Sequence, residues 1–387
     1  MFRCQPGFTL RKIKDTCYLL PYGQQIADQK KGFVLNDTSV FLWNALQHNE
    51  GASPRQLTDL LVRTYQLDET LFPELLNDVK DFLVQLTGLG MITEDLHLIS
   101  SQPSASMIIA GIPIKLYGPE ELFSECFKPF YKDFSDNAEQ NIELVTAPPA
   151  SRYYEQILLQ NSEMTIFENS DRYIVLFPQM KNIYEAHMLK DGSYVRIYCN
   201  PLATDLNIEN LFHAIRLFFL FLAQKNGLFA IHSASILYQK KAWLFSGHSG
   251  MGKSTHTALW HELWDIPYLN GDLNLLGLQD DHIIVYGIPW CGTSGIFTTR
   301  QYELGGIVLL GRDTQTDHLE ELSPSEKILR VMQRMISPSW KELQLSQNLS
   351  FAEEIADHVP VLHFLCTKNP SAAHTMKAAI DQLEDLQ

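Results

Sequence analysis

Residues 242–260 read Ala-Trp-Leu-Phe-Ser-Gly-His-Ser-Gly-Met-Gly-Lys-Ser-Thr-His-Thr-Ala-Leu-Trp, and the rest of the chain is best interpreted from this stretch. Positions 247–254 fit the pattern G-x-x-x-x-G-K-[ST] without a mismatch. An apolar, strand-like run leads into the glycines, and a helix-compatible run from Ser254 to His261 follows them. The stretch therefore predicts a strand, a tight loop and a helix, in that order.

This pattern is that of a P-loop (Walker A). Glycines lack a Cβ atom, so their backbone N–H groups can point at phosphate oxygens, and the start of the helix adds partial positive charge. We predict that Lys253 reaches the β- and γ-phosphates of ATP and that Ser254 holds Mg²⁺. A chance glycine loop before a helix is the alternative. The expected nucleotide-binding residues are Gly247, His248, Ser249, Gly250, Met251, Gly252, Lys253, Ser254 and Thr255.

Composition limits the classes of function. The chain has 387 residues, enough for two or three domains, and 45% of them are hydrophobic, which is ordinary for a globular protein. Its formal net charge of −15 disfavours a general nucleic-acid binder, which would normally be basic. We therefore expect no nucleic-acid partner.

Cysteine usage and hydropathy indicate a compartment. The six cysteines are scattered and form no C-x-x-C pair, so neither a zinc site nor a disulfide framework is expected. The longest apolar run, 217–223, lies between Arg216 and Lys225 and falls far short of the ~20 residues of a membrane span. The first residues lack the apolar core of a signal peptide. We expect a cytoplasmic protein without a membrane partner.

Residues 1–97 form a self-contained pattern of short strands followed by helices. Three strand-like runs (8–13, 17–20 and 32–35) precede three helical ones. The helices are expected to start at Asn36-Asp37, at Ser53-Pro54 and near Phe72-Pro73, and the last should stop at Gly88 and Gly90. This order predicts a small winged helix-turn-helix domain.

The same segment resembles the PqqD-like family, the recognition elements of pathways that modify ribosomally made peptides. The resemblance rests on residues 33–39, on the helix carrying Trp43, and on residues 79–83 and 89–92. It implies that a leader peptide adds a strand to the sheet edge and lies against a helix. A DNA-binding winged helix and a purely structural or dimerising unit are the alternatives. Only Lys80 lies in the core of the last helix, which disfavours DNA; a homo-oligomer stays open.

Residues 98–106 are rich in serine and are the expected linker to a larger domain, 107–387. In its first half we expect strands at 107–116 and 171–177, a hairpin around Asp191-Gly192 and a helix at 207–224. This half carries no recognisable chemistry.

The second half resembles the HPr serine kinase and phosphoenolpyruvate carboxykinase superfamily. The resemblance is carried by His232-Ser233-Ala234-Ser235 together with the glycine-rich stretch, and it extends over roughly 107–380. It implies a mixed α+β domain that binds ATP and Mg²⁺ and transfers a phosphoryl group to a hydroxyl.

The expected metal-binding position departs from that family. Where its kinases have two adjacent aspartates, this chain has Gly271-Asp272. Asp272 is the expected Mg²⁺ ligand beside Ser254, and the base for the acceptor hydroxyl is either Asp272 or His232. A histidine with only a packing role and a protein without transfer activity both stay open.

Four further residues of the same half carry side chains of interest for this site. Cys291 is expected to pack and not to act as a nucleophile, since no partner histidine is evident. Arg300, Arg330 and Arg334 either approach the transferred phosphate or lie in solvent.

Together these features predict a kinase that uses Lys253, Asp272 and His232 to phosphorylate a Ser or Thr hydroxyl of a ribosomally made precursor peptide. Two alternatives remain: a nucleotide-binding peptide chaperone without transfer activity, and a kinase of a small hydroxyl metabolite such as free serine.

Overall fold

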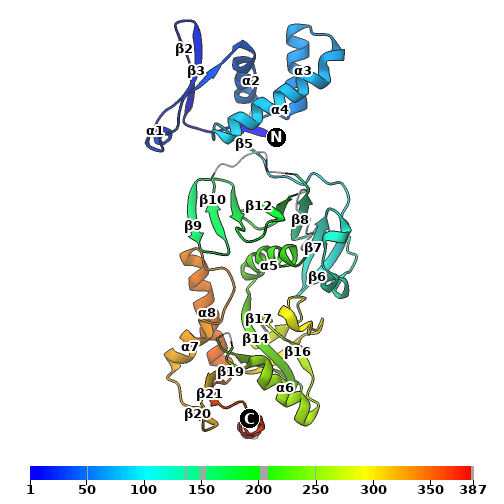
Figure 1. The fold of residues 1–387 in the computed structure, drawn as a ribbon, viewed down its shortest axis with the longest axis vertical. Helices are drawn as coiled ribbons and strands as arrows, with labels where there is room; N and C mark the ends of the chain where they lie inside the picture. The colour runs from blue at the N-terminus through cyan, green and yellow to red at the C-terminus, as the bar shows by residue number, and fades with distance from the viewer. Residues whose placement is uncertain are drawn as a thin grey trace.

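A computed structural model describes residues 1–49, 51–135, 137–147, 149, 154–200, 208–248 and 250–384. It mixes helices and strands throughout, which confirms the expected fold class. Figure 1 shows three parts that follow one another along the long axis: a small N-terminal part, a sheet with α5 below it, and a second sheet with helices around it. No helix within the described ranges has the length and apolar character needed to cross a membrane.

The N-terminal part has its own hydrophobic core, formed by residues between Phe2 and Ile92. The expected helix starts are confirmed. Asn36 caps one helix by accepting from the Ser39 N–H at 2.8 Å, and Ser53 forms a capping box with Gln56. The elements are β1 (Phe2–Cys4), β2 (Phe8–Ile13), β3 (Thr16–Pro21), α1 (Gln24–Ala27), β4 (Phe33–Leu35), α2 (Asp37–His48), α3 (Pro54–Tyr65), η1 (Glu69–Leu71), α4 (Phe72–Gly88) and β5 (Ile92–Glu94).

Two small sheets complete this part. The strands β2, β3 and β4 form an antiparallel sheet in that order, so β2 and β4 are its edges within the described chain. A second sheet pairs β1 with β5. The sequence did not predict β1, because three residues are too short to show an alternating pattern.

The middle part is a mixed sheet in the order β6-β7-β8-β13-β12-β11-β10-β9. Its elements are β6 (Ala105–Ile109), β7 (Ile112–Tyr117), η2 (Glu120–Leu122), η3 (Glu125–Phe130), β8 (Gln140–Val145), β9 (Gln156–Gln160), β10 (Thr165–Glu168), β11 (Arg172–Leu176), β12 (Ile183–Leu189), β13 (Tyr194–Cys199) and α5 (Ile208–Lys225). The expectation of one strand at 107–116 is wrong. The chain turns at Ala110 and Gly111, both with positive φ (51° and 83°), and forms the hairpin β6–β7.

Helix α5 lies between the two large sheets (Figure 1). Its buried residues, among them Phe218 and Phe219, share one core with Met107 and Val195 of the middle sheet and with Leu273. This apolar helix is buried on several sides, as its run of large side chains predicted.

The last part carries the glycine-rich stretch. Its elements are β14 (Leu228–Tyr238), β15 (Lys241–Ser246), α6 (Lys253–Trp264), β16 (Tyr268–Asn270), β17 (Leu273–Gln279), β18 (His282–Tyr286), η4 (Gly292–Ser294), β19 (Tyr302–Arg312), β20 (His318–Glu320), α7 (Pro324–Met332), α8 (Glu342–His358), β21 (Val361–Cys366) and α9 (Pro370–Glu384). Strands β15, β19 and β21 run parallel to one another, in that order. The long β14 pairs antiparallel with β17 through its first half and with β15 through its second.

Candidate functional site

The predicted strand, loop and helix are β15, residues 247–252 and α6. Gly250 and Gly252 have positive φ (76° and 96°), and Gly252 is the N-cap of α6. A Cβ atom on Gly247 would lie 3.1 Å from the Leu310 carbonyl oxygen, tighter than ordinary contact. Glycine is therefore used for backbone conformation at two positions and for close packing at a third. We call residues 247–252 the glycine loop.

Lys253, the first residue of α6, folds back over the glycine loop. Its Nζ donates to the Gly247 carbonyl oxygen at 3.2 Å. Burial lowers the pKa of Lys253, while nearby Asp272 opposes this effect and Arg334 reinforces it. Ser254 and Thr255 follow in the first turn of α6 and are exposed. Ser249 lies outside the described residues.

His232 and Asp272, which are 40 residues apart in the sequence, are in direct contact. His232 Nε2 and Asp272 Oδ1 are 3.0 Å apart, and the two side chains are 38% and 36% exposed. The hydrogen bond from His232 lowers the pKa of Asp272; burial opposes this, and the charges of Arg216 and Lys253 support it. The carboxylate is thus held ionised, with its second oxygen not used by His232.

Buried amides, which the sequence did not single out, hold Asp272 in place. Asn270 Oδ1 accepts from the backbone N–H of Asp272 at 3.0 Å and of Leu273 at 3.1 Å. Asn274 Nδ2 donates to the Ser233 carbonyl oxygen at 2.7 Å, and its Oδ1 accepts from Ser235 Oγ at 2.7 Å. The serines of the His-Ser-Ala-Ser stretch therefore tie β14 to the turn that presents Asp272.

Gly271 occupies the place of the first expected aspartate, and the structure gives a reason for it. A Cβ atom there would lie 2.6 Å from Ser294 Cβ, and one on Gly292 would lie 2.9 Å from Asp272 Cβ. Ser294 is fixed by its hydrogen bond to the Cys291 carbonyl oxygen at 2.7 Å. The loop carrying η4 therefore packs directly on the Gly271-Asp272 turn and leaves no space for a second carboxylate.

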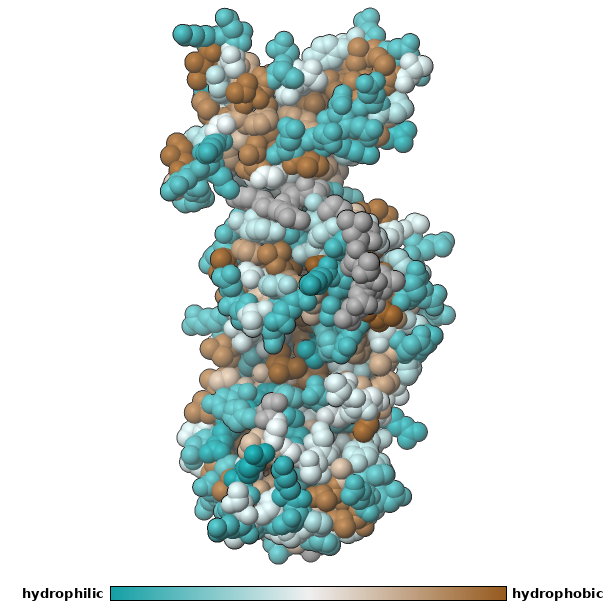
Figure 2. Space-filling model, in the orientation of Figure 1, coloured by the Kyte–Doolittle hydropathy of each residue, from teal (hydrophilic) through white to brown (hydrophobic). Residues whose placement is uncertain are grey.

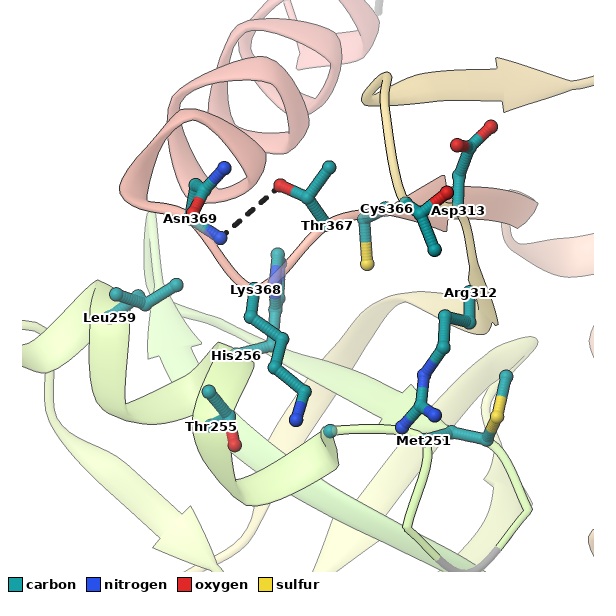
Figure 3. A pocket seen from close by; sticks show the side chains of 12 residues that line it. Met251, Thr255, His256, Leu259, Arg312, Asp313, Cys366, Thr367, Lys368 and Asn369 are labelled. Atoms are coloured by element: carbon teal, nitrogen blue, oxygen red, sulfur yellow. Dashed lines mark hydrogen bonds between the residues drawn. The ribbon is translucent and has the colours of Figure 1, made fainter.

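A cavity of about 280 Å³ opens beside the glycine loop, at the carboxyl ends of the parallel strands. Ligands of parallel sheets generally bind at this end. Figure 3 shows Arg312, the last residue of β19, and Lys368, which follows β21, with their side chains directed towards Met251 and the start of α6. Arg312 Nη2 donates to the Gly250 carbonyl oxygen at 2.9 Å. These cations were missed because strand order, which brings these ends together, is not readable from one sequence.

His256 lines the inner wall of this cavity and is 3% exposed. Burial lowers its pKa to about 4, so the ring is neutral at pH 7; Asp317 opposes the shift. Among the described residues, its Nε2 has no hydrogen-bond partner. A buried nitrogen without a partner is costly, and a ligand atom in the cavity would be a suitable partner for it.

The three arginines considered in the sequence lie in different surroundings. Arg334 reaches the glycine loop, with Nη1 and Nη2 at 3.1 and 2.9 Å from Nδ1 and Nε2 of His248. Arg330 contacts His363 Nε2 at 3.0 Å, and Arg300 is exposed. Burial lowers the pKa of Arg334, and the neighbouring Arg330 lowers it further. Positive charge is thus concentrated around the glycine loop in a chain with a net charge of −15.

Cys291 is buried, and burial raises the pKa of its thiol. A thiol held in its protonated form is a weak nucleophile, in agreement with the expected packing role.

The residues at the glycine loop suit a nucleotide and Mg²⁺. Mg²⁺ is usually held by one or two protein oxygens together with phosphate oxygens and water. Ser254 and Asp272 supply one hydroxyl and one carboxylate of that kind. Over the described ranges, no group of three or more His, Cys, Asp or Glu side chains is placed to hold a metal by itself.

Comparison with known proteins gives a family model and a number of solved structures, two of which are described below. Residues 24–92 match the family model described as Coenzyme PQQ synthesis protein D (PqqD), which confirms the PqqD-like resemblance. No curated protein matches the chain.

The first structure is TbiB1 in complex with the TbiA(beta) leader peptide, with a TM-score of 0.20 and 21% identity over 24% of this chain and 99% of that one. The second is the Hpr(Ser) kinase/phosphatase from Coxiella burnetii, with a TM-score of 0.24 and 10% identity over 40% of this chain and 94% of that one. The family model thus names the PqqD-like family that the N-terminal segment resembles.

Proposed function

We propose that this protein is an ATP-dependent kinase that phosphorylates a Ser or Thr hydroxyl of a ribosomally made precursor peptide. One observation carries the proposal. Lys253 at the glycine loop and Asp272 from the β16–β17 turn are close enough to shift each other's pKa, and Asp272 is paired with His232. A phosphate-binding cation, a carboxylate and a proton acceptor thereby converge at one helix N-terminus.

The nucleotide would lie along the loop and into the cavity of Figure 3. The loop N–H groups, Lys253 and Arg334 suit the phosphates, since charge-assisted hydrogen bonds to phosphate are strong. The cavity lined by Met251, Leu259 and His256 suits the nucleoside. Mg²⁺, when bound through Ser254 and Asp272, would neutralise charge on the β- and γ-phosphates.

The transfer step needs a proton acceptor. The acceptor oxygen would form a bond to the γ-phosphorus while the bond from phosphorus to the bridging oxygen of ADP breaks, and ADP leaves. Asp272 is a weak base because its pKa is lowered. If His232 donates through Nε2 to Asp272, its Nδ1 lone pair is available for the hydroxyl proton. We therefore assign the base to His232 and the orienting carboxylate to Asp272.

The N-terminal domain would capture the peptide. In PqqD-like proteins a leader peptide adds a strand to a sheet edge, and here β2 and β4 are edges. Large apolar side chains are exposed around this sheet, and Figure 2 shows brown residues over β2, β3 and α1. The exposed large side chains of this segment include Ile13, Tyr22, Ile26 and Val34.

The test uses the full chain with Mg-ATP and the precursor peptide encoded nearest to its gene. We expect a mass increase of one phosphate on the peptide. Lys253→Ala should weaken ATP binding measured by calorimetry, whereas Lys132→Ala, an exposed control, should not. His232→Gln should slow transfer by roughly 10²–10⁴-fold without loss of ATP binding. Absence of any mass increase in the wild type would refute the proposal.

The lack of a second carboxylate at Gly271 favours one alternative, a nucleotide-binding peptide chaperone without transfer. ATP and peptide binding without product, both unchanged by Asp272→Asn, would identify it. Phosphorylation of free serine, with no effect of added peptide, would identify a metabolite kinase.

A further inference from the structure

A second cavity, of about 440 Å³, lies between α5 and the middle sheet. Its wall is largely apolar and includes Phe177 and Leu220. Its charged or titratable groups are His213 and Arg216 from α5 and the exposed Glu163 from the turn between β9 and β10. No part of the nucleotide site described above contributes to this wall.

Arg216 is the unusual residue of this cavity. It is partly buried, and within the described ranges it forms no hydrogen bond or ion pair. Burial lowers its pKa, while the more distant charges of Asp272 and Glu163 oppose that shift. A guanidinium carries five N–H donors and stays charged, so one that is desolvated without a partner is costly. An anionic ligand in the cavity would remove that cost.

Helix α5, which carries Arg216, contacts the loop that packs on Asp272. Phe212 and Arg216 are four residues apart on α5 and therefore share a face of the helix. The Phe212 carbonyl oxygen accepts from Trp290 Nε1 at 2.9 Å. Trp290 leads into the loop in which Gly292 packs against Asp272. This helix face thus abuts the loop that covers the site.

Arg216 and Lys253 come from different elements around Asp272. Lys253 begins α6 and donates to the Gly247 carbonyl oxygen, so it belongs to the phosphate side of the site. Arg216 lies on α5 and in the wall of the second cavity, together with His213. The α5 side is therefore the side left for an acceptor.

We propose that Arg216 binds a carboxylate of the phosphoryl acceptor and thereby holds the acceptor hydroxyl beside Asp272 and His232. This inference rests on the proposed kinase function and specifies its acceptor as a hydroxyl compound with a carboxylate nearby. Two sources share that chemistry: an acidic residue next to the serine of a peptide, and the carboxylate of free serine.

The first experiment compares matched probes in the phosphorylation assay: L-serine with L-serinamide, and acetyl-Ser-Glu-amide with acetyl-Ser-Gln-amide. Loss of a charge-assisted hydrogen bond costs about 1.5–3 kcal/mol, so kcat/KM should be roughly ten- to hundredfold higher for the acidic member of one pair. The pair that shows the preference identifies the source of the carboxylate.

Variants of Arg216 test whether this residue causes the preference for the acidic probe. Arg216→Gln should abolish it and leave the KM for ATP unchanged, and Arg216→Lys should retain part of it. Arg63→Gln, at an exposed arginine of α3, is the matched control and should behave as the wild type. Equal kcat/KM for the two members of both pairs in the wild type, or an unchanged preference in Arg216→Gln, would overturn the inference.

A second experiment does not depend on transfer. Phenylglyoxal should modify Arg216, detected by mass spectrometry, and L-serine or acetyl-Ser-Glu-amide should protect it more than its neutral counterpart. ATP alone should not protect it. Lack of modification, equal protection by both members, or protection by ATP would overturn the inference. If this protection is seen but no probe is phosphorylated, the acceptor site stands and the kinase proposal fails.

Discussion

Gly271 lies against the loop that follows β18, where a Cβ atom would come 2.6 Å from Ser294 Cβ and 3.4 Å from the Cys291 carbonyl oxygen. The sequence showed only that an expected aspartate was missing and left its consequence open. The packing of η4 supplies the reason: the space of that side chain is filled by a neighbouring loop. The remaining carboxylate, Asp272, is supported by His232 instead.

Gly271→Ala should therefore destabilise the protein by about 1–3 kcal/mol, the usual cost of overpacking, and slow phosphoryl transfer because η4 must move. Urea unfolding and the phosphorylation assay measure the two effects. Gly88→Ala is the control, since no other part of the described chain comes within 4 Å of the Cβ position there. A Gly271→Asp variant that is as stable as the wild type and transfers faster would contradict this account.

His256 makes stability depend on pH. Burial lowers its pKa from 6.5 to about 4 in the folded chain, so the unfolded chain binds a proton that the folded one does not. Its contribution is complete above pH 6.5 and is lost as the pH falls towards 4, by about 3 kcal/mol in total.

We expect His256→Leu to flatten the decrease in unfolding free energy between pH 6.5 and 4 relative to the wild type. His282→Gln, at a 61% exposed side chain, should leave the decrease as it is. Urea titrations at several pH values give the measurement. An equally steep decrease in His256→Leu would show that other groups cause it.

At the scale of elements, local features were predictable and long-range pairings were not. The order β15, loop, α6 follows from adjacent residues: an apolar run, glycines and a helix-forming segment. The parallel pairings do not, because β19 pairs with β15, and β21 with β19, from positions beyond residue 300. For the same reason His232, Asp272 and Lys253 were predicted as site residues, whereas Arg312 and Lys368 were not.

Asn270 connects these elements. Besides accepting from two backbone N–H groups, its Nδ2 donates to the carbonyl oxygens of Ile288 and Trp290 at 3.4 and 3.3 Å. Asn270→Ala leaves these buried groups without partners, so stability should fall by about 2–3 kcal/mol.

In Asn270→Ala the rate of phosphoryl transfer should fall more than the affinity for ATP. The reason is that the turn that orients Asp272 becomes looser, whereas the glycine loop is unchanged. Calorimetry with ATP and the phosphorylation assay separate the two. Asn49→Ala, at an exposed position after α2, serves as control. Loss of ATP affinity equal to the loss of transfer would mean that Asn270 supports the whole site.

At the scale of the molecule, the predicted linker is anchored. The extent of residues 98–106 as a linker stays a prediction, drawn from serine and proline content. The structure adds that Glu143 in β8 accepts from the Ser100 N–H at 2.8 Å and from Ser100 Oγ at 2.7 Å. Arg196 Nη2 donates to the His97 carbonyl oxygen at 2.5 Å. Composition could not indicate this, since Glu143 lies more than 40 residues away.

This anchoring has a consequence for the proposed peptide kinase. A docked leader raises the concentration of the attached peptide at the active site, to about millimolar for a short flexible connection. If residues 97–100 are held against the middle sheet, the N-terminal domain keeps one orientation. The docked leader then lies at a fixed position relative to the active site. The anchor should then affect modification of the peptide without affecting the nucleotide site.

Glu143→Gln tests this. Burial raises the pKa of Glu143, but hydrogen bonds from Tyr194 and Ser100 outweigh burial and lower it, so the side chain is an ionised acceptor. The amide of glutamine has one acceptor oxygen in place of two, and its own N–H groups would face the donors of Ser100 and Tyr194. The loss of stability should be about 2–3 kcal/mol. We expect faster proteolysis near residues 98–104, a larger radius of gyration and a higher KM for the peptide.

ATP affinity should be unchanged, because Glu143 belongs to the middle sheet and its hydrogen bonds join it to Ser100, Tyr194 and Arg196. Glu74→Gln, at an exposed glutamate of α4, is the matched control. If Glu143→Gln unfolds more easily but keeps the wild-type KM for the peptide and the wild-type radius of gyration, the anchor only stabilises the middle sheet. Orientation of the N-terminal domain would then have to come from the bound peptide itself.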